Sequence, residues 1–550
     1  MTAHTAAPDS AGNGAARARR GPRTVIVGAG FGGIAAAIEL LGHGFNDITI
    51  LEKAPDLGGT WFYNSYPGAA CDVPSHLYSF SYAQRTDWSR LCSPQAEILA
   101  YLHDVARRHH VQELIETGVT VTSCEWRDDE RGSRWVVSRA DGHEHEADVL
   151  ILATGQLHQP ARPAIAGAES FAGHSFHSAE WDHDYPLAGR RVAVVGTGAS
   201  AVQFVPEIAP EAGRLTVFQR TGNWFLPRRN RAYPPLLRRA IESIPGLQAF
   251  RRRFMFEYTE SLTLTIRNPR TFGRLLRARS VAFMRAQLRD PEVRRRAWPD
   301  YTFGCKRILF SSSFLPALQR PNVELVSERI ERIEPRGLLT ADGRLHEVDC
   351  IIWATGFRAS DFMLPMRVAG RGGETLAERW SGGGAHAHLG MTVPGFPNMF
   401  MLYGPNTNTS GGSIIVYLEA QAGYIRAALQ ELARRGGGTM DVRAEVEAQS
   451  DRELQARFAG TAWLECDSWY HDEHGRIVTN WPGYMREYIS RTRALDASQF
   501  SFTPPPGRRG PGVPVAQPAT ATHTGDGART GDAAQAQAQA AAVQGSEQRT

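Results

Sequence analysis

Two copies of a strand–glycine–helix pattern, 168 residues apart, constrain the fold of this chain more than any other feature. In the first copy a strand-like run enters Gly28-x-Gly30-x-x-Gly33 and continues into a helical apolar run, and the second copy repeats the pattern from Gly196-x-Gly198. Glycines at these places permit a tight turn and let backbone N–H groups approach a pyrophosphate at a helix N-terminus. One such match is a weak signal, but two matches predict two dinucleotide-binding βαβ units.

The residue 24 positions after the first glycine of each copy predicts which dinucleotide binds there. In the first copy this residue is Glu52, whose carboxylate is a suitable acceptor for a ribose 2′-hydroxyl. In the second copy it is Arg220, whose guanidinium is a suitable donor to an adenosine 2′-phosphate. The first site is therefore expected to bind FAD and the second to bind NADP(H).

Two further apolar runs, at 148–156 and 349–357, both end in Ala-Thr-Gly and are typical of buried parallel strands. Their order predicts an α/β fold with two Rossmann-like dinucleotide-binding domains, for FAD and NADP, and an inserted helical subdomain. The expected segments are a disordered tail (1–22), the first part of the FAD-binding domain (23–157), the first part of the NADP-binding domain with its linker (158–225), the helical insert (226–300), the second part of the NADP-binding domain (301–380), the return to the FAD-binding domain (381–500) and a second disordered tail (501–550).

The insert contains apolar residues and arginines at helical spacing. We expect these arginines on the solvated face of the insert helices. A basic amphipathic helix is also suited to a membrane surface or an acidic partner, and this alternative stays open.

The bulk composition excludes several classes of protein. Lys and Arg total 61 and Asp and Glu total 57, so the formal charge of +4 gives no indication of nucleic-acid binding. The six cysteines contain no C-x-x-C pair, which favours a reduced, cytoplasmic protein without a structural metal. No apolar run approaches the ~18–20 residues that span a bilayer, so no integral membrane segment is expected.

Between the glycine motifs lies the segment Phe171-A-Gly173-HSF-His177-SAE-Trp181-Asp182. A single histidine in a linker is usually a hydrogen-bonded structural residue. The whole segment, however, resembles FxGxxxHxxxW(P/D), the fingerprint of type I Baeyer–Villiger monooxygenases. Related flavin monooxygenases that oxidise nitrogen or sulfur end this motif in Tyr or Phe instead of Trp-Asp or Trp-Pro.

A second segment, Gly58-Gly59-Thr60-Trp61-FYNS-YPG-AAC-Asp72, resembles GGxWxxxxYPGxxxD of the same family. Paired glycines let the backbone lie against a flat ring, and Trp61 offers an apolar wall. Gly59, Thr60, Trp61 and Asp72 are therefore expected at the flavin. Considered alone, Asp72 is equally suited to form a turn before Val73-Pro74.

The resemblance also implies roles for Lys306-Arg307. Arg307 would be the active-site arginine of the family, held by a bidentate pair with Asp72, and both residues would be catalytic. Lys306 and Thr221 would join Arg220 at the NADP 2′-phosphate, and Ser200 is expected to contact the same nucleotide. Without the family context, Lys306-Arg307 would be a surface dipeptide.

The resemblance implies an FAD- and NADPH-dependent Baeyer–Villiger monooxygenase. Such an enzyme inserts one oxygen atom of O₂ next to a ketone carbonyl through a C4a-peroxyflavin and yields an ester or lactone. The alternatives are a nitrogen- or sulfur-oxygenating flavin monooxygenase and a non-catalytic flavin-binding module. A disulfide reductase is excluded because no C-x-x-x-x-C follows the first glycine motif. The sequence does not identify the ketone substrate or the oligomeric state.

Overall fold

A computed structural model describes residues 21–228, 230–409 and 411–505. Its first parallel sheet has five strands in the order β19-β7-β1-β2-β3. Their bounds are Thr24–Val27 (β1), Ile48–Leu51 (β2), Ile115–Glu116 (β3), Val149–Leu152 (β7) and Met399–Met401 (β19). All four residues of β1 and of β7 are buried, as expected for parallel strands covered on both faces.

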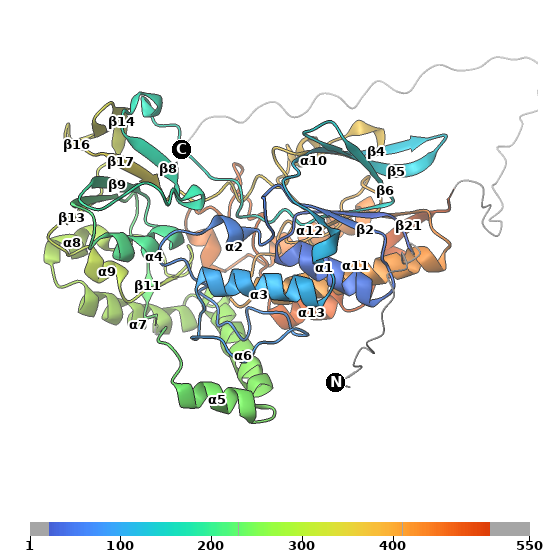
Figure 1. The fold of residues 1–550 in the computed structure, drawn as a ribbon, viewed down its shortest axis with the longest axis horizontal. Helices are drawn as coiled ribbons and strands as arrows, with labels where there is room; N and C mark the ends of the chain where they lie inside the picture. Colours follow the sequence, from blue (N-terminus) through green and yellow to red (C-terminus); the bar gives the residue numbers. More distant parts are fainter. Residues whose placement is uncertain (1–20, 229, 410, 506–550) are drawn as a thin grey trace, which may run out of the picture. The chain divides into compact units, whose positions relative to one another are not determined.

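Helices cover one face of this sheet and a second, smaller sheet covers the other. Apolar residues of α1 (Phe31–Gly42), α3 (Gln95–Arg108) and α11 (Ile414–Arg434) form one core with Ile26 and Ile50 (Figure 1). Val25 and Val27 point to the opposite core, which contains Trp126 and Trp135. These tryptophans belong to a four-stranded sheet built from β4 (Val121–Asp129), β5 (Gly132–Arg139), β6 (Glu144–Ala147) and β18 (Arg367–Ala369).

The second parallel sheet repeats this plan. Its order is β13-β10-β9-β17-β8, and all its neighbours run parallel. The bounds are His174–His177 (β8), Arg191–Val195 (β9), Arg214–Phe218 (β10), Val323–Val326 (β13) and Cys350–Trp353 (β17). Helices α4 (Ala199–Ile208) and α9 (Phe314–Ala317) contribute to the core on one face. The antiparallel strands β14 (Ile330–Glu334), β15 (Gly337–Thr340) and β16 (Leu345–Glu347) lie on the other. The predicted α/β fold with two dinucleotide-binding sheets is confirmed.

Four helices separate β11 (Phe225–Leu226) from β12 (Leu309–Phe310), which pair in parallel. They are α5 (Pro235–Ser243), α6 (Leu247–Arg267), α7 (Phe272–Gln287) and α8 (Pro291–Ala297). Proline is the first residue of α5 and of α8, and the side chain of Asp290 accepts hydrogen bonds from the first turn of α8. Figure 1 shows α5 and the adjoining end of α6 on the side away from both parallel sheets.

Two predicted boundaries are wrong. Phe362, Met366 and Val368 belong to the same core as Val25, and β18 pairs with β4, so the chain has returned to the four-stranded sheet that covers the first parallel sheet well before residue 381. The predicted tail from 501 begins too early, because β21 (Phe500–Thr503) pairs with β20 (Thr439–Val442). Residues 1–20 and 506–550 of the expected tails lie outside the described residues, and the other domain limits stay predictions.

The C-terminal part adds α12 (Ala444–Ala456) and α13 (Met485–Thr492) beside α11. Two shorter helices, α2 (Thr60–Tyr63) and α10 (Leu376–Trp380), complete the α-helices of the described residues. Within the described part of the chain, no helix has the length and apolar character needed to cross a membrane.

Candidate active site

The first glycine motif makes a turn that only glycine fits. Gly28 has φ +107°, and a Cβ there would lie 2.6 Å from the carbonyl oxygen of Ala153 at the end of β7. A Cβ on Gly33 would lie 1.9 Å from the carbonyl oxygen of Gly28. The helix α1 therefore starts directly behind the turn, and its free N–H groups lie at the cavity described below.

Glu52 follows β2 and is fixed beside this turn. Its side chain is buried, and its two carboxylate oxygens accept hydrogen bonds from the backbone N–H groups of Ala29 (2.7 Å) and Ala54 (2.9 Å). Each carboxylate oxygen has a second lone pair, so Glu52 still has acceptor capacity toward the cavity that it lines.

The second motif has the same turn and a positively charged side. Gly196 has φ +110°, and its Cβ would lie 2.4 Å from the carbonyl oxygen of Ala354. Arg220 follows β10 and is exposed, while the ammonium group of half-buried Lys306 lies 4.7 Å from the centre of the Tyr301 ring. Burial and the positive charge of Arg220 lower the pKa of Lys306. Two cations that repel each other in one cavity wall indicate a site for an anion.

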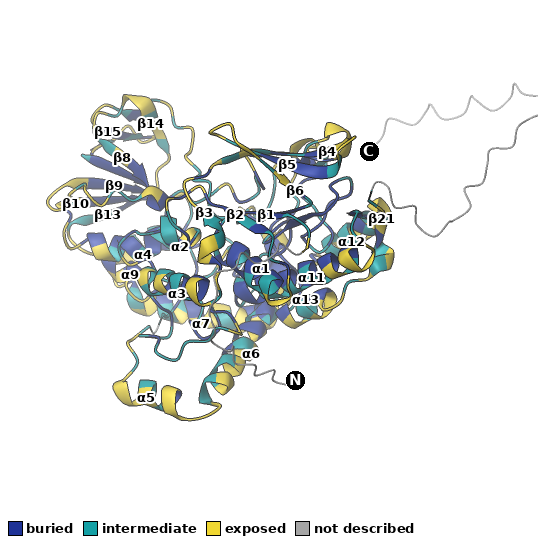
Figure 2. Ribbon diagram, turned by 45° about the vertical axis from the view of Figure 1, so that its right-hand side comes forward, coloured by how far each residue is buried: buried dark blue, intermediate teal, exposed yellow. Residues whose placement is uncertain are grey.

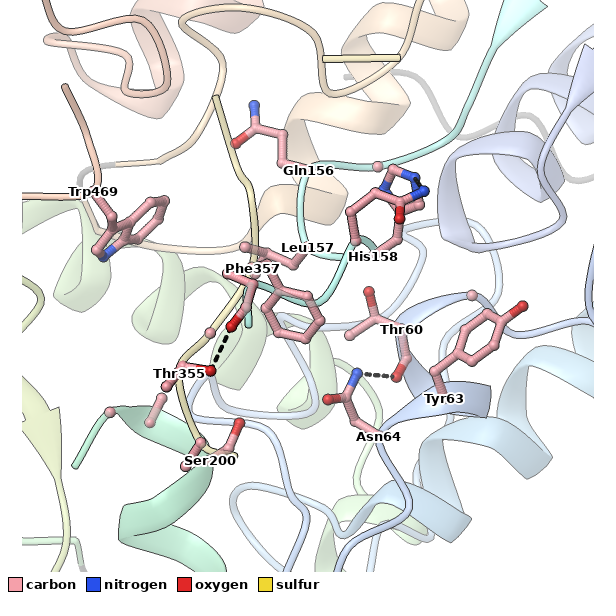
Figure 3. A pocket seen from close by; sticks show the side chains of 18 of the residues that line it. Thr60, Tyr63, Asn64, Gln156, Leu157, His158, Ser200, Thr355, Phe357 and Trp469 are labelled. Atoms are coloured by element: carbon pink, nitrogen blue, oxygen red, sulfur yellow. Dashed lines mark hydrogen bonds between the residues drawn. The ribbon is translucent and has the colours of Figure 1, made fainter. Parts of the chain in front are cut away.

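Both motifs open into one cavity of about 1430 Å³. Figure 3 shows side chains of Thr60, Ser200 and Trp469 around this cavity, from three distant segments of the chain. The residues expected from the sequence that line it are Gly28, Gly30, Glu52, Gly59, Thr60, Trp61, Asp72, Gly196, Gly198, Ser200, Arg220, Thr221, Lys306 and Arg307. Gly33 and the five fingerprint residues are not in its lining.

Arg307 and Asp72 meet in the wall of this cavity. One guanidinium nitrogen of Arg307 donates to Asp72 Oδ2 at 3.2 Å, and Gln203 Nε2 donates to Asp72 Oδ1 at 3.4 Å. Arg307 and Asp72 thus make a single hydrogen bond, and the predicted bidentate pair is wrong. The second carboxylate oxygen of Asp72 accepts from Gln203 instead. Burial in the wall acts to lower the pKa of Arg307, but Asp72, Tyr470, Tyr403 and Cys71 together outweigh it, so the pKa is raised. Arg307 is therefore a permanent cation, with 46% of its side chain accessible.

The fingerprint begins at the edge of the second sheet. A Cβ on Gly173 would lie 2.5 Å from the ring of Phe171 and 2.6 Å from the carbonyl oxygen of Asp349, so no larger residue fits there. His177 ends β8 and is fully buried, and its Nδ1 accepts from the N–H of Ala179 at 3.1 Å. Burial lowers the pKa of His177, which keeps the imidazole neutral. Its ring centre lies 5.9 Å from that of Phe357, which lines the cavity.

The end of the fingerprint packs against the second nucleotide-binding helix. The Trp181 ring lies 5.2 Å from Phe176, 5.1 Å from Phe204 of α4 and 6.5 Å from Tyr66. An Asp182 oxygen lies 2.8 Å from Nε2 of His174. The fingerprint thus connects the edge strand, α4 and the segment before Asp72, and it touches the cavity only through neighbouring residues.

Sequence reasoning missed Gln203 as the residue that links the two motif regions. It lies on α4, its Nε2 donates to the Ala70 carbonyl at 2.9 Å, and its Oε1 accepts from the Tyr66 hydroxyl at 3.1 Å. A glutamine on an amphipathic helix carries no signal of this kind, since the partners lie more than 130 residues away along the chain.

The cysteines correct a second expectation. Cys305 and Cys466 form a disulfide, so the six cysteines are not all reduced; the other four are free and buried. The disulfide ties the residue before Lys306 to the aromatic segment that starts at Cys466. Trp469 of that segment lines the cavity, and Trp481 is buried in the core.

Comparisons with known proteins agree with this geometry. Residues 25–244 match the family model described as pyridine nucleotide-disulphide oxidoreductase. A protein of Streptomyces coelicolor named Baeyer-Villiger monooxygenase is 40% identical over 513 residues, which cover 92% of this chain and 96% of the relative. The chain belongs to the Baeyer–Villiger monooxygenase family. A second member, from Pseudomonas aeruginosa, is 39% identical over 492 residues, with 89% of this chain and 93% of the relative covered.

Solved structures of this family share the fold. The closed crystal structure of cyclohexanone monooxygenase is 29% identical, with a TM-score of 0.79 and coverage of 88% of this chain and 99% of that one. Oxidized steroid monooxygenase bound to NADP is 29% identical, with a TM-score of 0.78 and the same coverage. The family membership expected from the two motifs is confirmed.

Proposed function

We propose that this protein is a Baeyer–Villiger monooxygenase that uses FAD, NADPH and O₂ to insert one oxygen atom next to a ketone carbonyl. The single observation that carries the proposal is the Arg307–Asp72 contact in the wall of the cavity that both glycine motifs share. The relatives in the family bear the same name, and a neighbouring structure is that of OTEMO in complex with FAD and NADP.

The residues around the first motif fit FAD. The turn at Gly28 leaves no room for a Cβ, and a Cβ on Gly30 would lie 3.5 Å from Cα of Gly59, so two backbones meet there without side chains. Glu52 would accept from a ribose hydroxyl, while Thr60 and Trp61 would contact the flavin. When bound and reduced, FAD supplies the two electrons that activate O₂ and transfers one oxygen atom to the substrate.

The residues around the second motif fit NADPH. Arg220 and Lys306 would bind the 2′-phosphate, because both are cations in one wall and Arg220 lowers the pKa of Lys306. Ser200 and Thr221 also line the cavity and offer hydroxyl donors. A cofactor without the 2′-phosphate would leave the two cations facing each other without an anion.

Arg307 would stabilise the negative charge that a carbonyl oxygen gains when its carbon is attacked. A guanidinium suits this role because it stays charged at any physiological pH and holds its donors in a plane. Asp72 positions Arg307, and Gln203 occupies the other oxygen of Asp72. The fingerprint residues, including His177 and Trp181, are proposed as positioning residues for the second sheet.

Product analysis tests the proposal. The purified flavin-loaded enzyme is incubated with NADPH, ¹⁸O₂ and a panel of cyclic and linear ketones, together with a thioether and a tertiary amine. We expect an ester or lactone that carries one ¹⁸O atom. Sulfoxide or N-oxide without any ester would instead indicate the nitrogen- or sulfur-oxygenating alternative, and NADPH consumption without any oxygenated product would indicate a module without oxygenase activity. The cytoplasmic location expected from the sequence stays a prediction.

A further inference from the structure

The hairpin of α5 and α6, residues 235–267, exposes several large apolar side chains. Five of its large apolar residues are exposed: Leu236 is 80% exposed, Phe250 67%, Phe254 62%, Ile244 53% and Tyr258 51%. On α6 the three aromatic residues follow each other at intervals of four, so they form one stripe along the helix. Isolated exposed apolar residues are common in proteins, but five on one hairpin form a surface that requires an explanation.

Several arginines of the same hairpin face the protein instead of water. Arg252 donates to the carbonyl oxygens of His76 (2.7 Å) and Ser79 (3.0 Å), and its side chain is 16% exposed. Arg251 donates to the Tyr233 hydroxyl at 3.0 Å, and Arg238 donates to the carbonyl oxygen of Asp87 at 3.2 Å. These three arginines depart from the expectation that the arginines of the insert lie on its solvated face, whereas Arg239 and Arg253 agree with it. The hairpin is therefore held to the protein through polar contacts, and its aromatic stripe points away from them.

The charge around this stripe is strongly positive. Residues 228–279 contain thirteen arginines, three glutamates and no aspartate or lysine, although the whole chain has a formal charge of only +4. Arg239 and Arg253 are exposed on the hairpin itself, and Glu257 is paired with Arg486 at 2.6 Å. Figure 2 shows α5 and the turn after it mostly in the colour of exposed residues.

We propose that the α5–α6 hairpin docks on an anionic lipid surface. Its aromatic and aliphatic side chains enter the boundary between headgroups and acyl chains, and the exposed arginines bind the lipid phosphates. Aromatic and aliphatic residues next to arginines on a short amphipathic element match the chemistry of such a surface, whereas a purely acidic partner would leave the aromatic stripe unexplained. The hairpin lies on the surface, since its inner face is occupied by contacts with the protein.

Sedimentation of the full-length, flavin-loaded enzyme with lipid vesicles tests the proposal. We expect binding to vesicles of phosphatidylcholine and phosphatidylglycerol in equal parts, and little binding to phosphatidylcholine alone. Added salt weakens this binding because it screens the arginines. In the double variant Arg239→Glu/Arg253→Glu, each of the two substitutions is expected to lower the partition coefficient by about fivefold or more.

The aromatic stripe has its own variant and control. Phe250→Ser/Phe254→Ser is expected to lower the partition coefficient about tenfold or more, because two large side chains no longer leave water. Leu464→Ser is the matched control: Leu464 is 53% exposed and lies in the short helix Ala462–Glu465, beside the other end of α6. This control should bind like the unmodified enzyme, and bound flavin absorbance shows that each variant is folded.

Three results would overturn the proposal. The first is an enzyme that does not sediment with anionic vesicles at low salt. The second is undiminished binding of the Phe250→Ser/Phe254→Ser variant. The third is a self-associated enzyme that becomes monomeric in this variant, because the stripe would then cover a second copy of the chain. None of these results depends on the oxygenation reaction, so the proposed function is tested separately.

Discussion

Replacing Arg220 with alanine removes one of the two cations that face the cavity beside the second glycine motif. Arg220 lies two residues after Phe218, the last residue of β10, so the sheet fixes where the chain leaves the strand. Its side chain is exposed, and its charge lowers the pKa of Lys306. The variant therefore loses a donor to the 2′-phosphate, while Lys306 becomes easier to protonate and remains as a second cation.

A hydrogen bond to a charged group contributes about 1.5–3 kcal/mol, which corresponds to about 10- to 150-fold in affinity. The exposed position of Arg220 and the remaining Lys306 favour the lower end of this range. We expect KM for NADPH to rise about tenfold and KM for NADH to stay nearly constant. The assay is steady-state cofactor oxidation with either nucleotide, and the NADPH/NADH preference is the quantity compared.

Arg214→Ala provides the control at the other end of the same strand. Arg214 pairs with Glu324 at 2.7 Å and its side chain is 54% exposed, so its loss removes only a surface ion pair. This variant should keep the cofactor preference of the unmodified enzyme. An unchanged preference in Arg220→Ala, or an equal change in Arg214→Ala, would refute the assignment of the 2′-phosphate site.

Three other predictions address the remaining features. Arg307→Ala should still oxidise NADPH but form no ester, as measured by product yield per NADPH consumed; a normal yield would remove Arg307 from the reaction. Gly173→Ala should lower the free energy of unfolding by about 1–3 kcal/mol, because the added Cβ would lie 2.5 Å from the Phe171 ring. Gly382→Ala, where a Cβ meets nothing within 4 Å, is its control in the same denaturant titration, and equal stability of both variants would contradict the packing argument. Thiol titration of the denatured protein should find four free thiols without reductant and six after reduction, and six in both samples would show that the Cys305–Cys466 disulfide is absent.

The sequence predicted the nucleotide-binding parts well because their chemistry is local. A strand, a glycine turn and a helix are adjacent in the chain, so Gly28 and Gly196 had to form turns whatever the rest of the fold. Glu52 and Arg220, which are expected to contact the two dinucleotides, follow the next strand at a fixed spacing. The fingerprint and the GGxW segment were equally readable, because each is one short continuous stretch of sequence.

Contacts between distant segments could not be predicted in the same way. The single contact between Arg307 and Asp72 spans 235 residues. Gln203, and not a second nitrogen of Arg307, donates to the other carboxylate oxygen of Asp72. The return of 362–369 to the four-stranded sheet over the first parallel sheet, and the Cys305–Cys466 disulfide, have no local marker either. In each case the outcome depends on which surfaces pack together.

By itself, the sequence determined that this chain has two dinucleotide-binding units, that its cofactors are FAD and NADP(H), and to which family it belongs. These properties follow from backbone turns and residue spacings that are set within about 30 residues. Only the tertiary structure decided that both motifs open into one cavity and that Arg307 lines it. It also decided that Arg238, Arg251 and Arg252 contact the protein while the aromatic stripe of α6 is exposed. Side-chain direction on a helix depends on which face meets the protein, and helical spacing alone leaves that choice open.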